Sequence, residues 1–192
     1  MKLGFERMSR WTRIFSSLFE LTQWLGAGYA FVLAAATIWL DASAFLEVTQ
    51  VLVPGLAPPV PVAILITYAL YVSMFFGCVL TAKIWQYIRK IFEISAGNAP
   101  ASIGPTPFQQ ENVRLLKKIA SYAIIIQLIN VAYLLIRIFS AAVVHSSATF
   151  IATNIMELFS CFASLVFGLI TFCLAHFFAY GIQLQLDSDG LV

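Results

Sequence analysis

Four long apolar runs dominate the pattern of hydrophobic and polar positions along the chain. They cover Leu21–Leu40, Val60–Ala82, Ile119–Val144 and Ile155–Tyr180. Each run approaches or exceeds the ~20 residues that a helix needs to cross the ~30 Å hydrocarbon core of a bilayer. The pattern therefore predicts an all-α integral membrane protein, a four-helix bundle forming a single membrane domain over residues 1–192.

Positively charged residues are distributed unevenly among the segments that flank these runs. Ten of the eleven Lys and Arg residues fall in two groups, one before the first run and one within 83–118, and only Arg137 lies outside them. The ten are Lys2, Arg7, Arg10, Arg13, Lys83, Arg89, Lys90, Arg114, Lys117 and Lys118. Because Lys and Arg accumulate on the cytoplasmic side of membrane proteins, we expect a cytoplasmic loop over 83–118 and both termini in the cytoplasm.

The chain around the first run carries two further signals. In residues 8–19, large apolar side chains recur at helical spacing with arginines between them. This pattern is typical of an amphipathic N-terminal helix on the inner leaflet, although a soluble partner-binding arm would share it. Within the run, Gly26, Ala30 and Ala34 recur every four residues. Such small residues let two helices approach closely, either inside the chain or with a partner.

Two connections have recognisable local patterns. The outer connection, Asp41–Pro59, is apolar but interrupted by Pro and Gly, so we expect a short helix or a partly extended loop along the outer membrane surface. The inner connection ends in Thr106-Pro107-Phe108-Gln109. Here Thr106 would cap a helix, Pro107 would occupy its first position and Gln109 would reach back to the cap amide.

Composition narrows the class of function. Hydrophobic residues make up 61% of the chain and charged residues 10%, whereas charged residues average about 25% in soluble domains. The bases are sorted along the chain and form no patch for a nucleic acid. With two histidines and no Cys-x-x-Cys pair, we expect no metal site and no cofactor. Known catalytic motifs are absent, so we expect no catalytic residues and favour a protein that is not an enzyme.

Two charged residues interrupt the third and fourth runs. If these runs form a hairpin that turns near Ser147, Arg137 and Glu157 each lie ten residues from the turn, at similar depth. A charge in hydrocarbon costs about 2.5–3.5 kcal/mol on insertion scales, so a salt bridge between the two would reduce that cost. The pair is either a structural ion pair, two side chains that extend to the interface, or part of a ligand or ion site.

Glu157 also begins a stripe of small and polar residues on the fourth run. The stripe continues through Ser160, Ser164 and Gly168 to His176, and we expect this face to point into the bundle, with Gly168 at a helix contact. His176 lies nineteen residues beyond Glu157, roughly 28 Å along a helix. Glu157 and His176 therefore cannot act on one substrate atom.

Two short segments carry a resemblance to a known family. They are Pro107-Phe108-Gln109-Gln110-Glu111-Asn112, before the third run, and the end of the chain from Phe178 to Val192, which closes on an acidic tail and Gly-Leu-Val. Together they resemble the bacterial four-helix membrane proteins of domain-of-unknown-function family 2975. The resemblance implies a multi-pass protein of the bacterial cytoplasmic (inner) membrane. It implies no reaction and no catalytic residues.

Three hypotheses for function remain. The first is a non-catalytic accessory or regulatory subunit that packs against another membrane protein, since the chain has small-residue stripes and lacks catalytic motifs. The second is a homo-oligomeric protein that binds or transports a small molecule or ion, with Arg137, Glu157 and the stripe lining a cavity. The third and weakest is an enzyme acting on lipids or quinones through His176. The expected partners are the lipid bilayer and either another membrane protein or further copies of this chain, and no nucleic acid.

Overall fold

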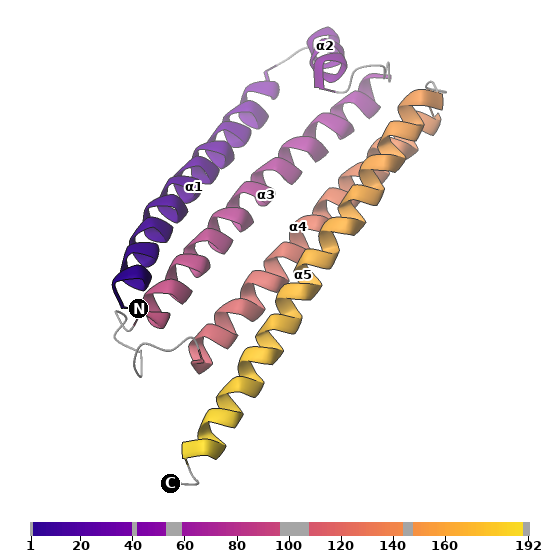
Figure 1. Ribbon diagram of the computed structural model, residues 1–192. Coiled ribbons are helices and arrows are strands. Elements are labelled where there is room, and N and C mark those ends of the chain that lie inside the picture. Colours follow the sequence, from indigo (N-terminus) through magenta and orange to yellow (C-terminus); the bar gives the residue numbers. More distant parts are fainter. Residues whose placement is uncertain (1, 40–41, 53–58, 97–107, 144–147, 190–192) are drawn as a thin grey trace. The chain divides into compact units, whose positions relative to one another are not determined.

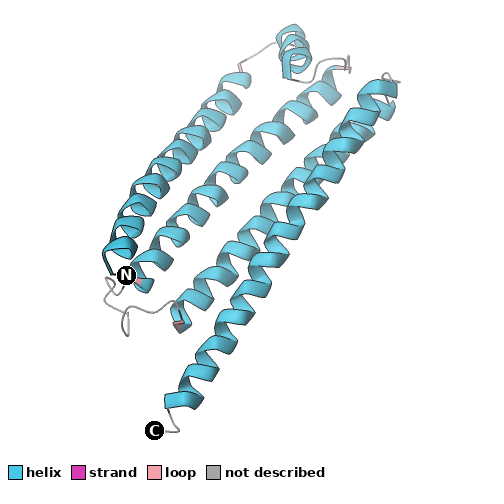
Figure 2. Ribbon diagram, viewed as in Figure 1, coloured by secondary structure: helices cyan, strands magenta, loops and turns pink. Residues whose placement is uncertain are grey.

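The computed structural model describes residues 2–39, 42–52, 59–96, 108–143 and 148–189. This part of the chain is all-α, as predicted, and nearly every described residue is helical (Figure 2). Its helices are α1 (Lys2–Thr37), α2 (Ala42–Leu52), α3 (Val60–Ser95), α4 (Gln110–Val143) and α5 (Ala148–Asp189) (Figure 1). A helix satisfies its backbone hydrogen bonds within one segment, which is the requirement that hydrocarbon imposes on a spanning chain.

Three of these helices, α3, α4 and α5, are long and apolar enough to cross a membrane. They contain the second, third and fourth predicted runs, except Val144, which lies outside the described residues. The predicted run Leu21–Leu40 lies in α1, which is not among the three. The last eighteen residues of α1, 20–37, include Glu20, Thr22 and Gln23, which lower the mean hydropathy of this part of the helix. A fourth crossing therefore stays a prediction.

The end of the first run also differs from expectation. Helix α1 ends at Thr37, and the amides of Ile38 and Trp39 bond to carbonyls three residues earlier, as in a tight final turn. The expected short helix in the outer connection is present as α2. Leu40 and Asp41 lie outside the described residues.

Contacts divide the chain into two units, and each of the four long helices contributes to both. Unit 1 comprises Met1–Gln23, Leu80–Ile124 and Val166–Val192, and unit 2 comprises Trp24–Val79 and Ile125–Leu165. Each unit is described below by itself. That residues 1–192 form a single domain stays a prediction.

Aromatic and glycine contacts join neighbouring helices in unit 1. The rings of Phe19 on α1 and Trp85 on α3 stack with centroids 4.7 Å apart. The rings of Tyr87 on α3 and Tyr122 on α4 stack at 5.7 Å. Helices α4 and α5 approach closely at Gly168, where an added Cβ would lie 2.8 Å from Cγ1 of Ile124. Each long helix of unit 1 is therefore packed against the next in chain order.

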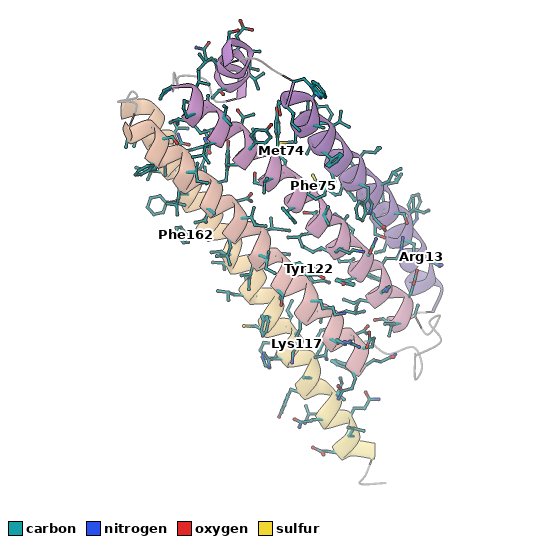
Figure 3. All side chains as sticks on the ribbon, turned by 180° about the vertical axis from the view of Figure 1, so that it is seen from behind. Arg13, Met74, Phe75, Lys117, Tyr122 and Phe162 are labelled. Atoms are coloured by element: carbon teal, nitrogen blue, oxygen red, sulfur yellow. The ribbon has the colours of Figure 1, made fainter. Side chains whose placement is uncertain are left out.

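In unit 2, α1 again packs against α3, and α3 against α4. Phe31 of α1 contacts Phe75 of α3, which is labelled in Figure 3, with ring centroids 6.5 Å apart. Ile66 of α3 and Ala141 of α4 are both fully buried and form one core cluster. The short helix α2 is held to α3 by a buried hydrogen bond of 3.1 Å between the hydroxyls of Thr49 and Thr67.

The inner ends of α3 and α4 differ from the predicted boundaries. Helix α3 continues through the predicted loop region as far as Ser95. Helix α4 begins at Gln110. The backbone amide of Val113, in its first turn, donates a hydrogen bond to the carbonyl of Gln109. The Gln109 side chain donates to the carbonyl of Ile94 at 3.4 Å. Gln109 therefore precedes the helix, whereas the capping pattern predicted that it would be the third residue of the helix. Thr106 and Pro107 of that pattern lie outside the described residues.

A buried amide locks these two helix ends together. The Asn112 side chain, which is fully buried, donates to the Ser95 hydroxyl at 3.0 Å. Because a buried polar group is costly without a partner, this bond and that of Gln109 fix α3 and α4 where they enter and leave the inner connection.

Candidate functional site

The predicted polar pair of the third and fourth runs lies in unit 2. Nη1 of Arg137 on α4 is 3.1 Å from Oε2 of Glu157 on α5. The Arg137 side chain is 15% exposed and the Glu157 side chain 46% exposed, so the arginine is mostly buried and the glutamate is about half exposed. The guanidinium also lies 5.5 Å from the ring centroid of Tyr133, within range of a cation–π interaction.

A shallow hollow of about 290 Å³ opens beside this pair. Its lining is mixed: Asn130, Tyr133, Leu134, Glu157, Ser160 and Cys161. The carboxylate of Glu157 accepts hydrogen bonds and the amide of Asn130 can donate and accept them, so the hollow can hold a small polar or cationic group. Arg137 itself is not among the lining residues, although both of its partners, Glu157 and Tyr133, are.

The serines of the predicted stripe are exposed on α5. The hydroxyl of Ser164 donates to the Ser160 carbonyl at 3.0 Å, so its donor is satisfied on its own helix. The expectation that this face points into the bundle is therefore wrong for Ser160 and Ser164. We name the exposed side chains Glu157, Ser160 and Ser164 the polar stripe of α5.

His176 belongs to unit 1 and is exposed. Its ring centroid is 5.9 Å from that of Phe172, one turn earlier on α5. It also borders an open hollow of about 540 Å³ together with Gln110 of α4 and Gln183 of α5. His176 and the Arg137–Glu157 pair therefore do not share a hollow.

The small residues predicted to support helix packing contact partners within the chain. A Cβ on Gly26 would lie 3.0 Å from Sγ of Cys78 on α3, and Ala30 is fully buried. Ala34 is half-buried, and its carbonyl accepts a bond from Thr37. Gly168 is buried against α4. The stripe on α1 thus meets α3 of the same chain at Gly26, and Ala30, one turn further, is buried within the chain.

A polar network between α1 and α3 in unit 1 was missed by the sequence analysis. Oε2 of Glu20 is 3.2 Å from Nη1 of Arg89, and Oε1 of Glu20 accepts a bond of 2.6 Å from Gln86. Arg89 also donates to the hydroxyl of Ser17 at 3.1 Å, and Lys83 donates to Gln86. The Glu20 side chain is 17% exposed, so these donors replace much of its contact with water.

The available signal for this network was weak. Glu20 is an isolated acid next to an apolar run, and Lys83, Gln86 and Arg89 recur every three residues. The spacing predicts one helix face, but the intervening α2 and its connections conceal the register between α1 and α3. From the sequence, Lys83 and Arg89 were counted only among the basic residues of a loop that indicate the topology.

The chemistry of these sites is that of hydrogen bonding and charge pairing. Within the described residues, no three His, Cys, Asp or Glu side chains lie close enough together to hold a metal ion. The cysteines at 78, 161 and 173 are free thiols. The arrangement can bind a polar group or another helix.

Comparisons with known proteins give one match. The family described as "Protein of unknown function (DUF2975)" matches residues 104–192. This match confirms the resemblance based on Pro107–Asn112 and Phe178–Val192, and it covers α4 and α5. No curated protein and no solved structure matches the chain.

Proposed function

We propose that this chain, which belongs to the DUF2975 family, is a non-catalytic integral membrane protein that packs against another membrane protein as an accessory or regulatory subunit. The observation that carries the proposal is the polar stripe of α5. It lies on a helix apolar enough to cross a membrane, yet it faces outward from the chain.

Lipid is a poor neighbour for this stripe. A carboxylate costs several kcal/mol in hydrocarbon, and its pairing with Arg137 leaves nearly half of the Glu157 side chain open. Two exposed serines on the same face add no apolar surface. A partner helix with polar or small side chains would cover Glu157 and approach closely over the serines. In the apolar eighteen-residue segment of α5 that could span a membrane, only 17% of the residues are buried. Most of the surface of this segment is therefore open to lipid or to a partner.

We propose further that the chain crosses the membrane four times, as a four-helix bundle with both termini in the cytoplasm. Helix α1 supports this because it runs antiparallel to α3 within each unit. In unit 1, Ser17 bonds to Arg89 and Phe19 stacks on Trp85. In unit 2, Gly26 lies against Cys78 and Phe31 against Phe75. A helix paired in this way with a spanning helix lies at the same depth. The exposed aromatic residues in the N-terminal part of α1, such as Trp11 and Phe15, suit an amphipathic helix at the inner leaflet.

Reporter fusions test this topology. Four crossings put residues 1 and 192 on the same side of the membrane, whereas crossings by α3, α4 and α5 alone put them on opposite sides. Fluorescent-protein and alkaline-phosphatase fusions at each end distinguish the two, and opposite reports from the two ends would refute four crossings. Fractionation of the expressing bacterium tests the proposed location in its cytoplasmic membrane.

Native mass spectrometry of the affinity-purified protein from nanodiscs tests the subunit proposal. We expect a stoichiometric second polypeptide, which Ser164→Leu should displace because the added side chain fills the serine face. Cys173→Leu is the matched control: Cys173 is also exposed and lies nine residues on, about half a turn around the helix from Ser164. Equal loss in both variants would remove the polar stripe as the docking face.

The hollow beside Glu157 favours one alternative, a homo-oligomer that binds or transports a small molecule or ion. The same spectra would then show copies of this chain carrying a defined small extra mass. Glu157→Gln should remove that mass while leaving the thermal unfolding temperature nearly unchanged. A second polypeptide without extra mass contradicts this alternative.

A further inference from the structure

A basic hollow of about 410 Å³ lies between α4 and α5 in unit 1. Its lining includes three cations, two hydroxyl-bearing side chains and one phenyl ring: Arg114, Lys117, Lys118, Ser121, Tyr122 and Phe172. Figure 3 labels two of these, Lys117 and Tyr122, on α4. We propose that this hollow binds the phosphate-bearing headgroup of an anionic phospholipid. The proposal is independent of any protein partner.

The three cations are close together on one helix and incompletely neutralised. Arg114 lies three residues before Lys117 and four before Lys118, spacings at which like charges on a helix repel one another. Glu111 offers partial compensation, with Oε2 3.8 Å from Nη1 of Arg114, and the two side chains are 42% and 69% exposed, respectively. Among the described residues, no carboxylate lies within ion-pair distance of Lys117 or Lys118. A bound anion would relieve this repulsion.

Aromatic rings fix the position of one of these charges. Nζ of Lys118 is 5.5 Å from the ring centroid of Tyr87, which is stacked on Tyr122. The cation–π contact holds the ammonium beside the hollow without neutralising its charge. Ser121 bonds to the Lys117 carbonyl at 2.9 Å, which keeps its side chain against α4. The charge is therefore already in place before a ligand arrives.

The position of the three basic residues on α4 makes a lipid the favoured source of the phosphate. After Lys118, residues 119–136 contain no Asp, Glu, Lys or Arg. These eighteen residues extend about 27 Å at 1.5 Å per residue, close to the thickness of the hydrocarbon core. The three bases thus lie where the helix enters the membrane, at headgroup depth. The exposed side chains of Phe172 and Leu169 on α5 offer an apolar wall for an acyl chain.

The test compares an anionic with a zwitterionic phospholipid of identical acyl chains. Phosphatidylglycerol and phosphatidylcholine with identical acyl chains are titrated into the detergent-solubilised full chain, and bound lipid is counted by native mass spectrometry. Glycerol 3-phosphate provides the soluble phosphate arm. We expect phosphatidylglycerol to bind at least tenfold more tightly than phosphatidylcholine, and glycerol 3-phosphate to compete weakly. Each neutralised lysine should weaken phosphatidylglycerol binding about fivefold, and the pair about 25-fold.

Charge variants assign the effect to this hollow. Lys117→Gln should weaken phosphatidylglycerol binding, whereas Lys90→Gln removes one exposed ammonium of α3 outside the hollow and should change it less than about twofold. The double variant Lys117→Arg, Lys118→Arg keeps both charges and should retain binding. If the variant with both lysines neutralised does not fold, the single variant Lys117→Gln, compared with Lys117→Arg, Lys118→Arg, still carries the test.

Three results would overturn the proposal. Equal binding of the two lipids to the unaltered chain would show no headgroup recognition. A loss in Lys90→Gln as large as that in Lys117→Gln would show a diffuse charge effect. Glycerol 3-phosphate binding as tightly as phosphatidylglycerol would assign the hollow to a soluble phosphate.

Discussion

The close approach of α5 to α4 at Gly168 makes a quantitative prediction about one methyl group. In Gly168→Ala the new Cβ would lie 2.8 Å from Cγ1 of Ile124 and 3.5 Å from the carbonyl oxygen of Ala120. Ile has one strongly preferred χ1 rotamer in a helix, so Cγ1 cannot rotate away freely. Overpacking of this kind costs about 1–3 kcal/mol.

A matched glycine isolates that cost. Replacing a helical Gly by Ala gains up to about 1 kcal/mol in helix propensity, and this gain applies to Gly168 and Gly28 alike. A Cβ on Gly28 would meet nothing within 4 Å. The difference between the free energies of unfolding of Gly168→Ala and Gly28→Ala should therefore equal the steric cost alone, about 1–3 kcal/mol in favour of Gly28→Ala.

Unfolding in mixed micelles, followed by circular dichroism as the denaturing detergent is titrated, measures this difference. The variant Ile124→Ala adds a further check, because it removes Cγ1 and should abolish the penalty of Gly168→Ala in a double-mutant cycle. If Gly168→Ala and Gly28→Ala change stability equally, α5 does not approach α4 at Ile124 as closely as the structure indicates.

Three other substitutions probe the polar contacts, each measured by the same unfolding titration. Glu20→Ala removes the carboxylate that accepts two side-chain donors of α3 and should cost about 1.5–3 kcal/mol, whereas Ser17→Ala, at the exposed edge of that network, should cost less than about 1 kcal/mol. Thr67→Val should cost about 1 kcal/mol by removing the buried bond that holds α2, and Thr22→Val, whose exposed hydroxyl bonds only to its own helix, should be nearly neutral. Asn112→Leu should cost about 1–3 kcal/mol, because the buried hydroxyl of its partner loses a donor. A cost for Ser17→Ala or Thr22→Val equal to that of its buried counterpart would contradict these assignments.

What could be predicted from the sequence depends on how far apart the interacting residues are in the chain. Helices α4 and α5 are consecutive, so counting ten residues either side of one assumed turn was enough to bring Arg137 and Glu157 to the same depth. Their atoms lie 3.1 Å apart in the structure. Helices α1 and α3 are separated by α2, whose length and direction the sequence does not give. The Glu20–Arg89 pair could not be found by the same counting.

The direction in which a helix face points was the second limit. Small residues at four-residue intervals predict a close contact but do not identify the contacting helix. Gly26 contacts Cys78 of the same chain, whereas Ser160 and Ser164, which have the same spacing, are exposed. Only the packing of neighbouring helices distinguishes the two, and at Gly26 it favours a contact inside the chain, one of the two alternatives that the spacing left open.

The two polar surfaces on which the proposals rest share one structural element. The hydroxyls of Thr22 and Thr171, like that of Ser164, are satisfied on their own helix. The carboxylate-bearing side chain of Glu157, in contrast, is nearly half exposed. The polar stripe of α5 and the basic hollow both lie on the hairpin of α4 and α5, which is also the part of the chain that the family match covers. Helices that only fill space in lipid have no need of outward-facing charges, which cost free energy there. Both proposals therefore place recognition on the hairpin of α4 and α5.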